Sequence, residues 1–127
     1  MKNCIKTTNA PLPIGPYNQA VLVNGILFIS GQIAINPVSN ELEKKDIQSE
    51  TLRVMQNLKA ILNEANMDFS NVVKSSIFLL DMNNFSEVNE VYGSFFDKET
   101  APARETVQVS HLPKDANVEI SMIAVKS

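Results

Sequence analysis

The chain has a single cysteine, Cys4, and a single histidine, His111, among its 127 residues. One thiol excludes an internal disulfide, and one thiol with one imidazole leaves too few ligands for a Cys/His metal site. A lone histidine in a turn also serves a Ser–His–Asp set poorly. We therefore interpret Cys4 as a small hydrophobe near a sheet edge and His111 as a turn residue.

Long apolar runs and basic stripes are absent as well. No segment approaches the roughly 20 apolar residues that span a bilayer, and no secretory signal opens the chain. We expect a cytoplasmic protein with no membrane partner. The net charge of −3 and the 6% aromatic content argue against nucleic acid as a partner, because phosphates require a basic surface and bases stack on aromatic rings. No glycine-rich phosphate loop occurs.

The composition that remains is that of a globular protein, with 44% hydrophobic and 20% charged residues. Its length predicts a single domain over residues 1–127. Hydrophobic periodicity predicts strands at 2–7, 17–23, 26–35, 72–80, 104–110 and 117–125, and helices at 47–65 and 85–97. The order β-β-β-α-β-α-β-β indicates an α+β fold, a mixed sheet with two helices on one face.

Local signals mark the joints of this fold. Asn24-Gly25 predicts a tight hairpin, because both central residues of such a turn need positive φ. Three prolines make residues 9–16 a stiff loop, and Asn66 is expected to end the first helix in the left-handed region. Gly31 interrupts an otherwise apolar strand at Ser30-Gly31-Gln32. A glycine there indicates either a bulge or the close approach of another group.

The two predicted helices are amphipathic. In the first, one set is expected to face the core: Leu52, Met55, Leu58, Leu62 and Ala65. The opposite set is expected in solvent: Arg53, Gln56, Asn57, Asn63 and Glu64. Asn83 or Asn84 is expected to cap the second helix, whose apolar face carries Phe85, Val88, Tyr92, Phe95 and Phe96. Asn89 falls at the edge of that face and needs a polar partner, structural or ligand.

Two helices can cover only one face of a sheet. If the other face is apolar or functional, another subunit must cover it, so the sequence predicts a closed homo-oligomer.

Arg104 is the most informative residue. It opens an otherwise apolar strand, whereas the other arginine, Arg53, falls on a polar helix face. A guanidinium stays charged and matches a carboxylate in two-point fashion. The matching anion could be a structural glutamate, with Glu119 on the last strand the candidate, or a substrate. In the second case Arg104 would hold the substrate carboxylate while Glu119 orients a water and shuttles protons.

Five segments together resemble the RidA/YjgF family of enamine/imine deaminases, also labelled L-PSP endoribonuclease-like. They are Ile-Gly-Pro-Tyr-Asn-Gln-Ala at 14–20, Phe-Ile-Ser-Gly-Gln at 28–32, 85–92 with Phe95-Phe96, Pro-Ala-Arg at 102–104, and Leu-Pro-Lys-Asp-Ala-Asn-Val-Glu-Ile at 112–120. Their order and spacing make the match specific over essentially the whole chain.

The resemblance implies a chorismate-mutase-like fold and a homotrimer with clefts between subunits. It implies hydrolysis of 2-aminoacrylate or 2-iminobutyrate to a 2-oxo acid and ammonia without a cofactor. Arg104 then resembles the carboxylate binder and Glu119 the residue that places the water. Further pocket residues are expected at Tyr17, Ser30, Gly31, Asn89 and Thr106.

Two positions depart from the family pattern. Thr106 replaces a frequent cysteine, which excludes a thiolate nucleophile but not attack by water, and Glu105 replaces a small residue. Strand alternation turns Glu105 away from the face of Arg104. Two other functions stay open: an endoribonuclease acting on mRNA, and a non-catalytic module that binds small carboxylates or acts as a chaperone.

Overall fold

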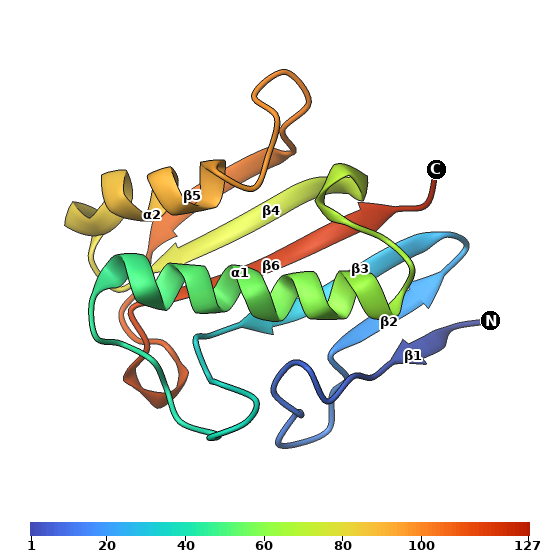
Figure 1. Ribbon diagram of the computed structural model, residues 1–127, viewed down its shortest axis with the longest axis horizontal. Helices are drawn as coiled ribbons and strands as arrows, with labels where there is room; N and C mark the ends of the chain where they lie inside the picture. Colours follow the sequence, from blue (N-terminus) through green and yellow to red (C-terminus); the bar gives the residue numbers. More distant parts are fainter.

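The computed structural model describes residues 1–127 and contains six strands and two α-helices (Figure 1). The elements are β1 (Asn3–Ile5), β2 (Ala20–Val23), β3 (Ile26–Gln32), α1 (Ile47–Glu64), β4 (Val72–Leu79), α2 (Phe85–Gly93), β5 (Ala103–Gln108) and β6 (Val118–Val125). Short 3-10 turns lie at Phe69–Asn71, Met82–Asn84 and Pro113–Asp115. The predicted order of strands and helices is confirmed.

All six strands form one sheet in the order β1-β2-β3-β6-β4-β5. Only β4 and β5 pair in parallel, which suits strands joined by the crossover helix α2. Both helices lie on the same face of the sheet (Figure 1). Strand β5 is left at the sheet edge, where its outer side pairs with no other strand.

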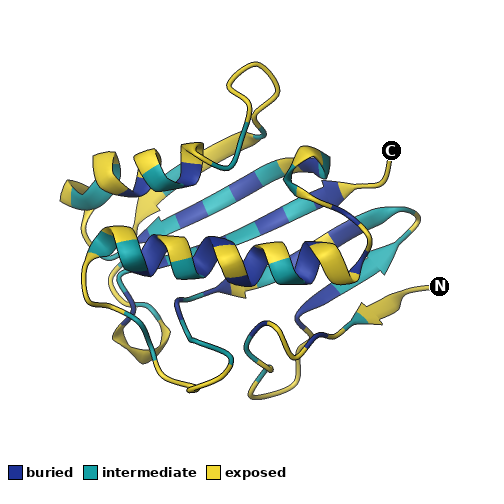
Figure 2. Cartoon of the chain, viewed as in Figure 1, coloured by how far each residue is buried: buried dark blue, intermediate teal, exposed yellow.

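The core lies between the helices and the sheet, where buried and half-buried residues alternate along the central strands (Figure 2). Helix α1 contributes the largest share, with Val54, Met55, Leu58, Ile61 and Leu62 all at 0% exposure. Burial of each such side chain stabilises the fold by about 1.5–3 kcal/mol.

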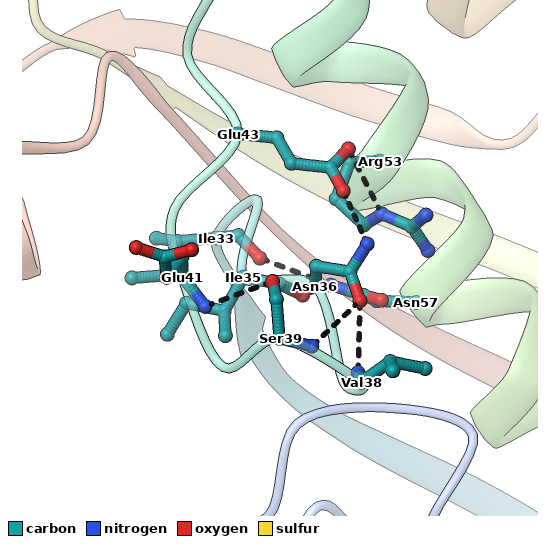
Figure 3. A network of polar contacts seen from close by, with 9 residues as sticks. All are labelled: Ile33, Ile35, Asn36, Val38, Ser39, Glu41, Glu43, Arg53 and Asn57. Atoms are coloured by element: carbon teal, nitrogen blue, oxygen red, sulfur yellow. Dashed lines mark hydrogen bonds and ion pairs between the residues drawn. The ribbon is translucent and has the colours of Figure 1, made fainter.

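The predicted faces of the first helix were wrong at two positions. Leu52 is 41% exposed, whereas Asn57 is fully buried. The Asn57 amide is tolerated there because its Nδ2 donates to the carbonyl oxygens of Ile33 and Ile35, at 3.1 and 3.0 Å (Figure 3). Arg53 is not freely solvated either, since its Nε lies 3.3 Å from the Glu43 carboxylate.

Two strands and one helix lose three or more residues at one end relative to the prediction. Strand β3 ends at Gln32 rather than 35, because its register with β6 shifts between Ile29 and Gln32 and the chain then leaves the sheet. Strand β2 begins at Ala20 rather than 17. Helix α2 stops at Gly93 rather than 97. The other boundaries differ by one or two residues.

The turn signals were largely correct. Asn24 and Gly25 have φ of 51° and 77°, as the predicted hairpin requires, and Asn66 has φ of 59° after the end of α1. Asn84 precedes α2 but makes no side-chain capping bond. The carboxylate of Asp81 instead accepts from the backbone of Asn83 and caps the preceding 3-10 turn.

The face of the sheet away from the helices carries exposed apolar side chains. Phe28, Val107 and Val125 are 45%, 42% and 39% exposed. The same face carries an ion pair between Lys74 Nζ and Glu105 Oε1, 2.8 Å apart. Glu105 therefore does point away from Arg104, as strand alternation predicted. No helix is long and apolar enough to cross a membrane.

Candidate active site

Arg104 lies against helix α2. Its Nη1 donates to Asn89 Oδ1 at 2.6 Å, and its Cζ lies 5.2 Å from the ring centre of Tyr92 and 5.7 Å from that of Phe85. Aromatic faces attract a guanidinium electrostatically, so the helix holds this cation in place. The polar residue at the edge of the apolar stripe, Asn89, thus has Arg104 as its partner. The other guanidinium donors make no hydrogen bond within the chain and remain available to an anion.

A cavity of about 540 Å³ opens beside Arg104. Its walls are formed by Asn89, Tyr92, Gly93, Phe96, Lys98, Ala101, Pro102 and Arg104. None of these residues is acidic, so nothing in the wall competes with an incoming anion. Burial raises the pKa of Tyr92, whose hydroxyl donates to Ser75 Oγ at 2.9 Å, so this phenol stays neutral under the cation.

Glu119 lies half-buried on β6, against the glycine that interrupts β3. A Cβ built at Gly31 would lie 2.8 Å from Glu119 Cδ, closer than real side-chain carbons approach. Both readings of Gly31 therefore hold, because the register shift of a bulge coincides with the close approach of the carboxylate. Burial raises the pKa of Glu119, since removal from water disfavours its charged form.

A second cavity, of about 310 Å³, contains Glu119. It is lined by Pro11, Leu12, Ile14, Tyr17, Gln19, Gly31, Gln32, Ile33, Ile35, Pro113, Lys114 and Glu119. The structure thus brings three of the expected site residues together: Tyr17, Gly31 and Glu119. Ser30 lies next to this wall, and its hydroxyl donates to the Asn18 carbonyl at 2.6 Å.

Arg104 and Glu119 project from opposite faces of the sheet. Arg104 pairs with Ser75, which pairs with Met122, and these two lie buried beneath the helices. Glu119 pairs with Phe78 of β4. Because successive residues of a strand alternate between faces, Phe78 and Ser75 lie on opposite faces, and so do Glu119 and Arg104. No ion pair joins Arg104 to Glu119, so the alternative of a structural pair within one chain is not supported. The expected residues other than Thr106 fall into two groups, one with Arg104 and one with Glu119, and each group is termed a half-site.

Thr106 shares the face of Arg104 but not its cavity. The Thr106 hydroxyl is buried and has no hydrogen-bond partner in the chain. Within one chain, Thr106 therefore does not line either of the two cavities.

Two polar residues that support these half-sites were missed from the sequence. The Gln19 side chain, 2% exposed, accepts from Thr7 N at 2.7 Å and donates to the carbonyls of Thr7, Ala10 and Pro11. It fastens the proline-rich loop that walls the second cavity. Glu50 is fully buried on α1 and binds Asn117. The position of Gln19 inside the 14–20 motif could have indicated a structural role, whereas no local sequence pattern indicated that Glu50 is buried.

The fold and the site define a single-sheet α+β protein in which an arginine and a half-buried carboxylate each open on a cavity. The profile of the family described as Endoribonuclease L-PSP matches residues 7–126. The chain belongs to this family, which is also called RidA/YjgF, Rid or RutC.

Known proteins similar to the chain cover almost all of it. A RutC family protein of Pyrococcus horikoshii is 49% identical over 99% of both chains. The structure of the Rid family protein YyfA from Yersinia pestis has a TM-score of 0.96 and 47% identity, covering 99% of this chain and 100% of its own. Escherichia coli TdcF, solved with bound serine, has a TM-score of 0.92 and 41% identity, covering 98% and 99%.

Proposed function

We propose that the chain hydrolyses 2-imino acids, and the 2-enamine acids from which they form, to 2-oxo acids and ammonia. Its substrates would be small, such as 2-iminobutyrate and 2-aminoacrylate. The observation that carries the proposal is the pair of half-sites: a cation suited to binding a carboxylate on one face of the sheet, and a half-buried carboxyl suited to proton transfer on the other. Because one chain cannot bring them together, the site is assembled between subunits.

Binding falls to the half-site of Arg104. The guanidinium takes the substrate carboxylate in two-point fashion, while Asn89 and the Tyr92 ring keep its plane fixed. The serine bound to TdcF is a small amino acid with the same carboxylate, which supports a ligand of this class. Positioning of this kind can supply a large part of the rate enhancement when the substrate is already electrophilic.

The chemical step falls to Glu119. Water adds to C2 of the protonated imine while the Glu119 carboxylate accepts a proton from it. The resulting carbinolamine takes that proton on nitrogen, and its hydroxyl returns a proton to the Glu119 carboxylate as the C–N bond breaks. The products are a 2-oxo acid and ammonia, which takes the last proton from Glu119 and leaves as ammonium. One water is consumed and one ammonia is released. The raised pKa of Glu119 brings it closer to neutral pH, where a proton shuttle works best.

This route requires no thiolate, so Thr106 is compatible with it, and it requires no cofactor. Ser30 is proposed to reach the substrate only in the assembled site. The Thr106 hydroxyl is already buried within its own chain, so assembly alone does not bring it to the substrate and Thr106 is not proposed to contact it. Tyr17 and the backbone of Gly31 are proposed to complete the wall around the reacting carbon.

The assembly is proposed to be a homotrimer. The exposed apolar face of the sheet, with Phe28, Val107 and Val125, supports burial against other copies. The position of Arg104 on the edge strand β5 supports contact with a neighbouring cavity. The Lys74–Glu105 ion pair neutralises the acidic residue on this face within its own chain. Light scattering measures the mass directly: three chains are expected, and a monomer would contradict the proposal.

The test of the activity is 2-oxobutyrate release in a coupled threonine dehydratase reaction. Arg104→Ala is expected to abolish the acceleration, and Arg104→Lys to lose most of it, because lysine lacks the two-point fork. Arg53→Ala is the matched control, since the other arginine pairs with Glu43 and lines neither cavity. Unchanged turnover in Arg104→Ala would eliminate this site. Calorimetric binding of 2-oxobutyrate without turnover would favour a non-catalytic module.

An endoribonuclease is the second candidate, supported by the description of the family. The net charge of −3 argues against it, because RNA binding relies on phosphate contacts. Salt-sensitive binding of single-stranded RNA by the pure protein, lost in Arg104→Ala, would favour this function over deamination.

A further inference from the structure

The turn between β5 and β6 is held in a conformation that its residues do not favour. Lys114 has φ of 54° and Asp115 has φ of 57°, two successive residues in the left-handed region without a glycine. Such backbone costs energy and persists only where the surroundings hold it. The same turn supplies Pro113 and Lys114 to the wall of the Glu119 cavity. What fastens the turn therefore also shapes the candidate site.

The fastening comes from the segment that begins α1. The Glu50 side chain, 0% exposed, accepts from Asn117 N through Oε2 at 2.7 Å and from Asn117 Nδ2 through Oε1 at 2.8 Å. A third hydrogen bond joins the same regions, since Lys44 Nζ donates to the Asp115 carbonyl at 2.9 Å. The pair of hydrogen bonds between Glu50 and Asn117, termed the Glu50 clamp, joins residues that are 67 positions apart in sequence. Ala116, between the two bonded residues, is fully buried.

We propose that Glu50 is a positioning residue for the Glu119 half-site. It fixes Asn117, from which the chain enters β6 and reaches Glu119 two residues later. It thereby holds the Lys114 turn as one wall of the cavity and sets where the Glu119 carboxylate meets Gly31. This inference rests on the proposed function, in which Glu119 must be held against the substrate of a neighbouring chain.

The chemistry of the clamp predicts which replacements work. Both groups of Asn117 that face Glu50 are donors, and a carboxylate can accept from both. Glutamine keeps both bonds if the Asn117 amide turns over, so that Oε1 accepts from the backbone while Nε2 donates to Oδ1. Alanine keeps neither and leaves the Asn117 N–H unpaired, which is unfavourable in a buried site. If glutamine restores the wild-type behaviour, the hydrogen bonds of residue 50, and not its charge, hold the turn in place.

The experiment compares Glu50→Ala, Glu50→Gln and the milder Asn117→Ala with Val54→Ala. Val54 is buried on the same helix but lines neither cavity, so its loss lowers stability without touching the turn. Steady-state deamination gives kcat and KM well below the unfolding temperature. Hydrogen exchange at the Asn117 and Val118 amides reports the turn without any substrate.

In Glu50→Ala we expect kcat to fall by about 10- to 100-fold with KM within about threefold, because Arg104 still binds the carboxylate while Glu119 is misplaced. The Asn117 amide should exchange faster than in Val54→Ala, and Glu50→Gln should restore both readings. If Glu50→Ala does not fold, Asn117→Ala must show the same pattern in weaker form. Equal exchange and unchanged kcat in Glu50→Ala and Val54→Ala would overturn the proposal.

A wild-type chain without deaminase activity would instead overturn the proposed function and, with it, the catalytic part of this inference. The exchange measurement would still decide whether Glu50 holds the turn.

Discussion

Gly31 and Glu119 occupy neighbouring strands so closely that a single methyl group at position 31 would overlap the carboxylate. Position 31 has an ordinary negative-φ backbone, so the glycine is required by space and not by backbone conformation. The overlapping atoms belong to the flexible end of the Glu119 side chain, which can swing away. The contact thus constrains where the carboxylate lies more than whether the chain folds.

Gly31→Ala is therefore expected to lower the deaminase activity while changing the stability of the fold only slightly. The melting temperature should change by no more than about 2 °C, since the side chain yields, whereas kcat should fall by about tenfold or more because Glu119 leaves its position. Thermal unfolding and the coupled deaminase assay on the same sample separate the two. A variant with normal kcat would show that the position of Glu119 is not critical.

The pH dependence of stability is expected to expose Glu119 directly. Burial raises its pKa in the folded chain, and the titratable groups sharing its cavity are Tyr17 and Lys114. A carboxyl with a raised folded pKa stabilises the fold below its unfolded pKa, about 4.3, and that contribution is lost as pH rises through the folded value. In Glu119→Gln the side chain cannot ionise, so the variant does not lose this stabilisation as the pH rises. Thermal unfolding should therefore show the variant gaining on wild type from pH 4 upward.

The same shift governs catalysis in wild type. The carboxylate form accepts the proton from water, so kcat should fall toward acid with a midpoint above that of an ordinary glutamate. A value of kcat that stays constant down to about pH 4.3 would show that Glu119 does not take part in the chemical step.

Asn89→Asp is expected to block substrate binding through charge alone. The new carboxylate would take the place of the amide oxygen 2.6 Å from Arg104 Nη1 and form an ion pair with it. A substrate carboxylate would then have to displace a partner already in place, and KM should rise by about tenfold or more. Asn89→Ala serves as the comparison, because it loses the orienting bond without adding charge and should raise KM less. Equal KM in the two variants would mean that Arg104 does not bind the carboxylate.

Much of the fold followed from local patterns, because strand alternation, helical spacing and turn residues are encoded within a few positions. Asn24-Gly25 and Asn66 were correct for this reason. Asn57 was assigned to the wrong face because the loop carbonyls of Ile33 and Ile35 need donors, which hydrophobic periodicity does not reveal.

For the candidate site, the sequence indicates the face of each strand on which a residue lies, but not how those faces are related in space. Alternation gives the face of Arg104 along β5 and of Glu119 along β6, but the relation between those faces depends on the register through β4. Glu50 and Asn117 were missed for a related reason. Their contact spans 67 residues and joins a helix to a turn, so no local pattern announces it.

The central claim is that each site takes Arg104 from one chain and Glu119 from another, and complementation tests it most directly. Arg104→Ala and Glu119→Ala are each expected to be inactive alone. When equal amounts are dissociated and reassembled together, random pairing should restore about a quarter of wild-type activity, the chance that an intact arginine meets an intact glutamate across an interface. Mixed oligomers that stay inactive would contradict the account.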